Sequence, residues 1–246
     1  MLFIGIDLAW SPENESGIAA IAGEGTKGEL IGFGICRRDE EILSFIDHLV
    51  GEGYALVAID APLIVPNSYG FRPVEKEIIK LYRKADATPY PANRRRLCIH
   101  GRIRGEELAT KLKGLRFEHN PYISKFQSTR TFFEVFPHPA MLTIFRLKKI
   151  LKYKERANRS YEMRWKELKK YQRLLLRLER RVPKLKLPKK IIQRKVEGLR
   201  GRELKHYEDL LDSIFCAYIA YYYWCFPERV KVFGDLEKGY IVIPIR

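Results

Sequence analysis

The chain has 246 residues, of which 46% are hydrophobic and 12% aromatic, and this composition excludes an intrinsically disordered protein. Its net charge of +16 favours a polyanionic partner. Four cysteines without a Cys-x-x-Cys pair argue against a zinc finger or a disulfide scaffold. The start, MLFIGIDLAW, has no basic leader and soon reaches a charge, so we expect neither a signal peptide nor a membrane anchor, and a cytoplasmic protein.

The first third of the chain predicts a sheet. Residues 2–9 form an apolar run typical of a central strand covered on both faces. Glycines separate two further strands, which we expect to be antiparallel, and a helix and a fourth strand follow. These elements are expected at residues 17–22, 30–36, 39–50 and 54–60. The fourth strand ends at Asp60, because Pro62 removes a backbone donor.

The rest of the chain predicts mostly helices. Between residues 62 and 130 the sequence is rich in loops, and after that a fifth strand ends where two prolines flank His138. Helices are expected near 73–84, 106–112, 160–181, 191–196 and 206–225, and strands at 131–136, 229–233 and 240–245. This order predicts an α/β protein with an RNase H-like mixed five-stranded sheet, three antiparallel strands and then parallel strands, flanked by helices.

The positive charge is confined to one stretch. Residues 146–205 hold 24 Lys or Arg and 6 Asp or Glu, a net charge of +18, and the remainder has a net charge of −2. We therefore expect residues 1–145 plus 206–246 to form the core and 146–205 a basic helical insertion. A solvated basic face is the alternative for this insertion, but so large an imbalance favours nucleic-acid contact. The contacts expected there are Lys169, Lys170 and Arg173.

Four aspartates are candidates for a metal site. Asp7 lies in the first strand and Asp60 at the end of the fourth, and in this topology those strands are parallel neighbours. Asp209 and Asp212 are three residues apart, so they share one face of the last helix, and small side chains continue that face. Such a ridge lets a helix lie close to a sheet. Carboxylates of this kind suit Mg²⁺ or Mn²⁺.

The motifs GIDLAW, VAIDAPL, FEVFPHPA and EDLLDSIFCAYIA resemble successive motifs of domain-of-unknown-function family 429, predicted RNase H-like nucleases. The order of acids also resembles that of Holliday-junction resolvases. The resemblance implies a metal-dependent nuclease acting on DNA or RNA. It implies that Asp7, Asp60 and Asp212 bind the metal, that Asp209 assists, and that Glu134 or His138 lies near the rim. RNase H enzymes have Glu as the second acid, where this chain has Asp60.

Two of these residues also have structural interpretations. Glu134 lies within an aromatic strand, and a buried carboxylate there needs an arginine, for which residues 94–96 are candidates. His138 is either an acid or base that moves a proton or a loop histidine satisfied by its neighbours. An arginine cluster follows the fourth strand and either binds phosphate or pairs with internal acids. It comprises Arg94, Arg95, Arg96, Arg102 and Arg104.

Two other functions fit the same sequence. One is an actin-like or sugar-kinase-type phosphotransferase, because Ser11, Ser16 and Gly17 follow the first aspartate as in the phosphate loop of those folds. The usual glycine after that aspartate is replaced by Ala9 and Trp10. The other is a nucleic-acid-binding protein of the same fold without catalysis. The choice between DNA and RNA, the mode and specificity of cleavage and the oligomeric state stay open.

Overall fold

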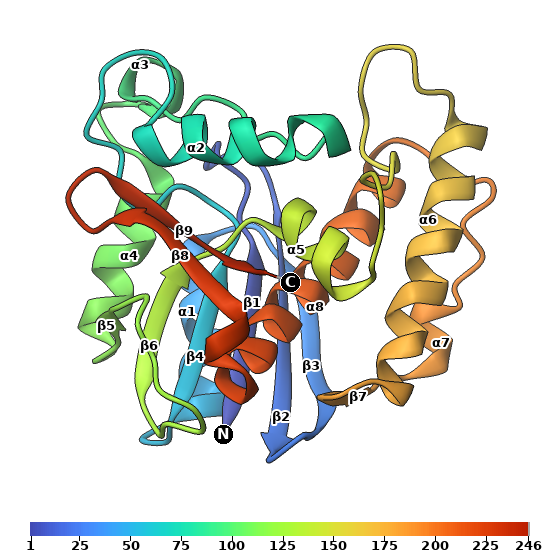
Figure 1. The fold of residues 1–246 in the computed structure, drawn as a ribbon, viewed down its shortest axis with the longest axis horizontal. Coiled ribbons are helices and arrows are strands. Elements are labelled where there is room, and N and C mark those ends of the chain that lie inside the picture. Colours follow the sequence, from blue (N-terminus) through green and yellow to red (C-terminus); the bar gives the residue numbers. More distant parts are fainter. Residues whose placement is uncertain (246) are drawn as a thin grey trace.

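The computed structural model describes residues 1–245, in which a mixed seven-stranded sheet has helices on both faces (Figure 1). The strands lie in the order β5-β6-β4-β1-β2-β3-β7. β2 pairs antiparallel with both β1 and β3, and the other neighbours are parallel. The strands are β1 (Leu2–Asp7), β2 (Ser16–Glu24), β3 (Lys27–Cys36), β4 (Ala55–Ile59), β5 (Glu118–His119), β6 (Arg130–Glu134) and β7 (Lys184–Lys186). The α/β prediction is therefore confirmed.

The helices connect and cover these strands. They are α1 (Asp39–Val50), α2 (Pro73–Tyr82), α3 (Arg94–Leu97), α4 (Arg104–Gly114), α5 (Pro137–Ile144), α6 (Tyr161–Leu176), α7 (Lys189–Ile192) and α8 (Gly201–Cys225). Short 3₁₀ turns are η1 (Arg83–Ala85), η2 (Arg177–Arg180) and η3 (Pro227–Arg229). A separate antiparallel hairpin consists of β8 (Val230–Asp235) and β9 (Gly239–Pro244). In the part of the chain described, no helix has the length and hydropathy needed to cross a bilayer.

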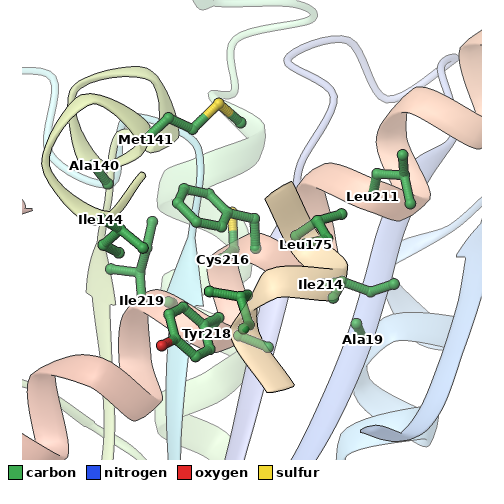
Figure 2. Close-up of a cluster of buried hydrophobic side chains, with 14 of the residues drawn as sticks. Ala19, Ala140, Met141, Ile144, Leu175, Leu211, Ile214, Cys216, Tyr218 and Ile219 are labelled. Atoms are coloured by element: carbon green, nitrogen blue, oxygen red, sulfur yellow. The ribbon is translucent and has the colours of Figure 1, made fainter. Parts of the chain in front are cut away.

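Alternate side chains of the sheet pack in two hydrophobic layers, as expected for strands with a period of two. Phe3 of β1 points to the layer that contains α5, α6 and α8, whereas Ile4 and Ile6 point to the layer that contains α1 and α4. Figure 2 shows part of the first layer, with Ile214 of α8 and Leu175 of α6 in the same hydrophobic cluster over the sheet. The sheet is thus covered on both faces, as the apolar run of β1 predicted.

The sheet has seven strands where five were expected. All five expected strands are present, and β5 and β7 extend the two edges. Both added strands are very short, and β7 lies between Pro183 and Pro188, so neither has an apolar run that could be recognised in the sequence. The four cysteines are free, as expected.

The basic stretch 146–205 is packed into the rest of the molecule. Leu168 and Leu175 of α6 belong to the same hydrophobic cluster as Phe133 of β6 and Phe215 of α8. The stretch also supplies β7, which pairs with β3. The division into a core and an insertion stays a prediction, but the two parts share one hydrophobic interior.

Close contact between α8 and the sheet depends on glycines. A Cβ atom at Gly5 of β1 would lie 2.1 Å from the backbone nitrogen of Ala217 and from the carbonyl oxygen of Ser213. A Cβ atom at Gly17 of β2 would lie 2.2 Å from the carbonyl oxygen of Asp209. The expected ridge of small residues on α8 therefore meets glycines in the sheet, and backbone packs on backbone.

We expect Gly5→Ala to lower the free energy of unfolding by about 3 kcal/mol, because the added methyl group overlaps the α8 backbone, which cannot shift cheaply. The measurement is urea denaturation. Gly34→Ala in β3 is the matched control, since a Cβ atom there meets no atom within 4 Å. Equal losses of stability in the two variants would contradict this account of the packing.

Candidate functional site

A cleft of about 240 Å³ opens at the carboxyl ends of β1, β4 and β6. The open edge of parallel strands is where sites collect in α/β sheets. The other walls come from residues 72–90, the start of α5, the segment between α5 and α6, and β9. Its titratable lining residues include Asp7, Asp60, Glu134, His138, Lys154 and Arg156.

Asp7 and Asp60 lie next to each other at this edge. Ile6 pairs with Ile59 in the parallel register of β1 and β4, and the backbone N–H of Asp60 donates to the carbonyl oxygen of Ile6 at 2.8 Å. Burial and the neighbouring charge of Asp7 raise the pKa of Asp60 well above its usual value. No residue within 1–245 donates a hydrogen bond to the Asp60 carboxylate, whose oxygens therefore remain available to a ligand.

Lys154 lies between two of the acids. Its Nζ is 3.3 Å from Oδ2 of Asp7 and 2.7 Å from Oδ2 of Asp212, and the hydroxyl of Tyr153 donates to Oδ1 of Asp212 at 2.6 Å. Burial disfavours the charge on Lys154, but Asp212, Asp7 and Asp60 outweigh it and raise the pKa of the ammonium well above its usual value. The carboxylates thus surround one internal cation.

The two acids of α8 are buried side chains, with exposures of 2% for Asp209 and 1% for Asp212. Helix α8 begins at Gly201, five residues before the expected start at 206, so neither acid lies in the first turn and the helix N-terminus does not explain them. Burial raises the pKa of Asp212, and burial together with Asp7 raises the pKa of Asp209 to about 8 although it pairs with Lys205. Tight packing of α8 on the sheet holds both acids out of water.

The donor set suits a hard divalent cation in part. Asp7 and Asp60 present carboxylate oxygens to the cleft, and Mg²⁺ often needs only one or two protein carboxylates together with water and phosphate oxygens. Asp212 is engaged by Tyr153 and Lys154. Within residues 1–245, no group of three or more Asp, Glu, His or Cys side chains is arranged to hold a metal ion. Asp7 and Asp60 are therefore the ligands that fit, and Asp212 joins them only if Lys154 moves.

Glu134 forms part of the cleft wall. Its two oxygens accept hydrogen bonds from Arg72 at 2.6 and 3.0 Å, and one of them also accepts from the N–H of Leu63 at 3.0 Å. Arg72 is 1% exposed and donates to Glu75 as well. Glu134 therefore pairs with an arginine, as expected, but this arginine is Arg72 and not one of residues 94–96. Glu134 fixes the wall and has no oxygen free for a ligand.

His138 lines the cleft from the first turn of α5, where a loop was expected. Burial and the charge of Lys154 lower its pKa to about 3, so the imidazole is neutral at physiological pH. Its Nδ1 atom is buried and has no hydrogen-bond partner within residues 1–245. The ring lies parallel to that of Tyr153 at 6.5 Å. A neutral imidazole in this position is able to orient water, whereas a pKa of about 3 makes it a weak base near neutral pH.

The arginine cluster divides into several roles. Arg104 is buried and donates to Asp39 and to the carbonyl oxygens of Ala9, Ser11 and Asn14, so it stabilises the loop after β1 and is not available to phosphate. Its expected contact with nucleic acid is therefore replaced by a structural role.

The other four arginines of the cluster are more exposed. Arg94 and Arg102 each pair with a glutamate of α4, at 3.2 Å in both cases. Arg95 lies over the ring of Tyr69, and Arg96 lies 5.1 Å from the ring centroid of Tyr90. Arg96 is thus the member of the cluster that stands next to a residue of the cleft, because Tyr90 lines it.

The three basic residues expected to contact nucleic acid from α6 lie on its outer side. Lys169 pairs with Glu197 and Lys170 with Glu167, whereas Arg173 is exposed and forms no ion pair within residues 1–245. Nothing in this geometry tests their contact with nucleic acid, which stays a prediction.

Three residues at or behind the cleft were not recognised from the sequence. Tyr153 and Lys154 lie in the run KKILKYKER, where nothing distinguishes one lysine from the others. Arg72 lies in the loop-rich segment before α2. The available signal was the surplus of acids at the strand ends, since several buried carboxylates require a buried cation.

The protein-family comparison supports the motif assignment. The family model described as protein of unknown function (DUF429) matches residues 5–235, nearly the whole chain. The chain belongs to this family. Neither the curated proteins nor the solved structures yielded a match. Membership of DUF429 identifies relatives without assigning an activity, so function has to be argued from the cleft.

Titration of Asp209 has a consequence for stability. Its carboxyl has a pKa of about 8 in the folded chain and about 3.8 in the unfolded chain, so the folded state holds the proton more tightly. The stability it contributes is fully present below about pH 4 and is lost as the pH rises towards about 8. We expect Asp209→Asn, which stays neutral, to gain stability relative to the unmodified protein over this range. Urea denaturation at several pH values measures it, and a difference independent of pH would contradict it.

Proposed function

We propose that this protein is a metal-dependent phosphodiesterase of RNase H-like fold that acts on nucleic acid. The observation that carries the proposal is the convergence of Asp7, Asp60 and Asp212, from β1, the end of β4 and α8, around one cation at the open edge of the sheet. Such an arrangement binds a cation strongly, because burying carboxylates without a cation costs free energy.

The order of the strands supports the fold assignment. Within the larger sheet, β3-β2-β1-β4-β6 has three antiparallel strands followed by parallel ones, the arrangement expected for an RNase H-like core. In this arrangement the first and fourth strands bring their acids together, and the last long helix adds a third. The positions of Asp7, Asp60 and Asp212 follow that scheme.

Each residue of the cleft has a defined part in the proposed reaction. Asp7 and Asp60 would hold Mg²⁺ or Mn²⁺, which when bound supplies charge stabilisation to the phosphate oxygens. The neutral ring of His138, with its unpartnered Nδ1 atom, is positioned to orient water. Tyr153 fixes Asp212 through its hydroxyl. Glu134 and Arg72 keep the wall rigid.

The rim of the cleft suits a nucleic-acid strand. Tyr90 is 50% exposed, and the guanidinium groups of Arg96 and Arg156 each lie 5.1 Å from its ring centroid. Arg159, another lining residue, has no acidic partner within residues 1–245. Guanidinium groups bind phosphate oxygens, and the ring of Tyr90 holds two of them at the rim of the cleft.

A nucleic-acid-binding protein without catalysis is the second candidate, and one observation favours it. Lys154 already neutralises part of the acid cluster, so a metal ion has to displace or share that charge. A sugar-kinase-type phosphotransferase gains no such support. Ser16, which was expected in its phosphate loop, is fully buried in β2 and accepts a hydrogen bond from the N–H of Ala9.

Replacing Asp7 separates catalysis from binding. We expect Asp7→Asn to lower the rate of cleavage of DNA or RNA at least a hundredfold with Mg²⁺ or Mn²⁺, because one of the two proposed ligand carboxylates is lost, while nucleic-acid affinity is kept. Cleavage is followed on gels with linear and branched substrates. Asp47→Asn on the exposed face of α1 is the control. Unchanged cleavage by the Asp7 variant would reject the site, and absence of cleavage by the unmodified protein would favour the second candidate.

Replacing Lys154 tests the competition between the ammonium and a metal ion. We expect Lys154→Met to bind Mn²⁺ at least tenfold more tightly, because the cation that holds Asp7 and Asp212 is removed. Isothermal titration calorimetry measures the affinity. Lys152→Met is the control, since Lys152 is half-exposed and pairs only with Asp86 at 3.8 Å. Weaker Mn²⁺ binding by the Lys154 variant would show that the lysine supports the metal site.

A further inference from the structure

A second hollow, the basic groove, lies away from the acid cluster and has a volume of about 1070 Å³. Its walls come from the end of α5 and the loop after it, the end of η2, α8 and the C-terminal hairpin. Five basic residues from these separate segments line it: Arg146, Lys148, Arg180, Arg181 and Arg229.

The positive charges that line the basic groove have almost no acidic partners. No aspartate or glutamate belongs to its lining. Within residues 1–245, only Arg229 has an acidic partner, its chain neighbour Glu228, and this pair is 3.7 Å apart with both side chains exposed. Converging like charges destabilise a free protein, so a site of this kind is relieved by a bound polyanion.

Helix α5 links the basic groove to the cleft. His138, in its first turn, lines the cleft, whereas Thr143 and Ile144, in its last turn, line the basic groove. A helix of eight residues is about 12 Å long at 1.5 Å per residue. One strand of B-form DNA advances about 3.4 Å per nucleotide, so this span corresponds to roughly three or four nucleotides.

The chemistry of the basic groove favours a phosphodiester backbone. Four of its five cations are arginines, whose planar guanidinium groups bind two phosphate oxygens at once. The hydroxyl-bearing rings of Tyr218 and Tyr222 form part of the floor. The groove is concave, so a flat anionic bilayer is a poorer fit than a chain of phosphates that follows it.

We propose that the basic groove binds the phosphodiester backbone of a nucleic acid a few nucleotides away from the segment that lies in the cleft. Binding in the groove needs no metal and no cleavage, whereas its relation to the cleft rests on the proposed function. The ligand class is therefore a nucleic acid long enough to reach both hollows, and the groove supplies affinity while the cleft supplies chemistry.

The test uses the full-length protein and a fluorescent 20-base-pair DNA duplex or its RNA counterpart, with EDTA present to prevent cleavage. We expect Arg180→Ala/Arg181→Ala to weaken binding at least tenfold and to reduce the slope of log K against log salt by about 2, because two phosphate contacts are lost. The matched control is Lys189→Ala/Lys190→Ala, which removes the same charge from the exposed face of α7. We expect the control to lose less than threefold.

A second variant guards against misfolding. Arg146 and Lys148 are exposed lining residues from a different segment, so Arg146→Ala/Lys148→Ala should weaken binding to a similar extent without disturbing the core. Equal effects of groove and control variants, or no effect of either groove variant, would overturn the proposal. The proposal would also be overturned if the groove variants lost binding to anionic phospholipid vesicles while their nucleic-acid affinity stayed unchanged. If the groove variants lose binding and the unmodified protein cleaves nothing, the groove proposal is supported and the nuclease proposal is rejected. If the protein cleaves nucleic acid and the groove variants keep their affinity, the nuclease proposal is supported and the groove proposal is rejected.

Discussion

The contact of α8 with β1 and β2 is the constraint on which the rest of the structure depends. Because Gly5 and Gly17 have no side chain, the helix backbone lies directly on the strands. This contact carries Asp209 and Asp212 to the strand end at Asp7 and removes them from water. The cluster of acids is therefore a product of hydrophobic packing, since the apolar residues of the same helix supply the stabilisation that offsets the burial of its charges.

Buried acids in turn require cations close by, and two of these cations border the cleft. Lys154 serves Asp7 and Asp212 on the floor of the cleft, and Arg72 serves Glu134 and Glu75 in its wall. The two cations differ in kind. Arg72 binds its partners through a planar fork with fixed geometry, whereas Lys154 is a point charge on a flexible chain. The wall is thus rigid, while the floor contains a cation that is able to exchange for another.

Much of the fold could be predicted from local patterns. The apolar run at residues 2–9, the helical spacing at 39–50 and the acids at strand ends located the sheet and brought Asp7 next to Asp60. The short edge strands β5 and β7 could not be predicted, because a run of two or three residues shows no hydrophobic periodicity. The role of Lys154 could not be predicted either, since only the tertiary fold distinguishes it from the lysines near it in the sequence. For the same reason the sequence could not decide between a phosphate contact and an internal acid for Arg104, because burial is not visible in a cluster of arginines.

The internal position of Lys154 also separates folding from metal supply. In proteins with a structural zinc site the ion is needed for folding, and a chelator unfolds the chain. Here the ammonium already provides charge to the carboxylates, and the hydrophobic layers on both sides of the sheet are complete without an ion. If the cleft holds a divalent ion as proposed, the chain would keep its fold when that ion is scarce, because neither the charge balance nor the packing depends on it.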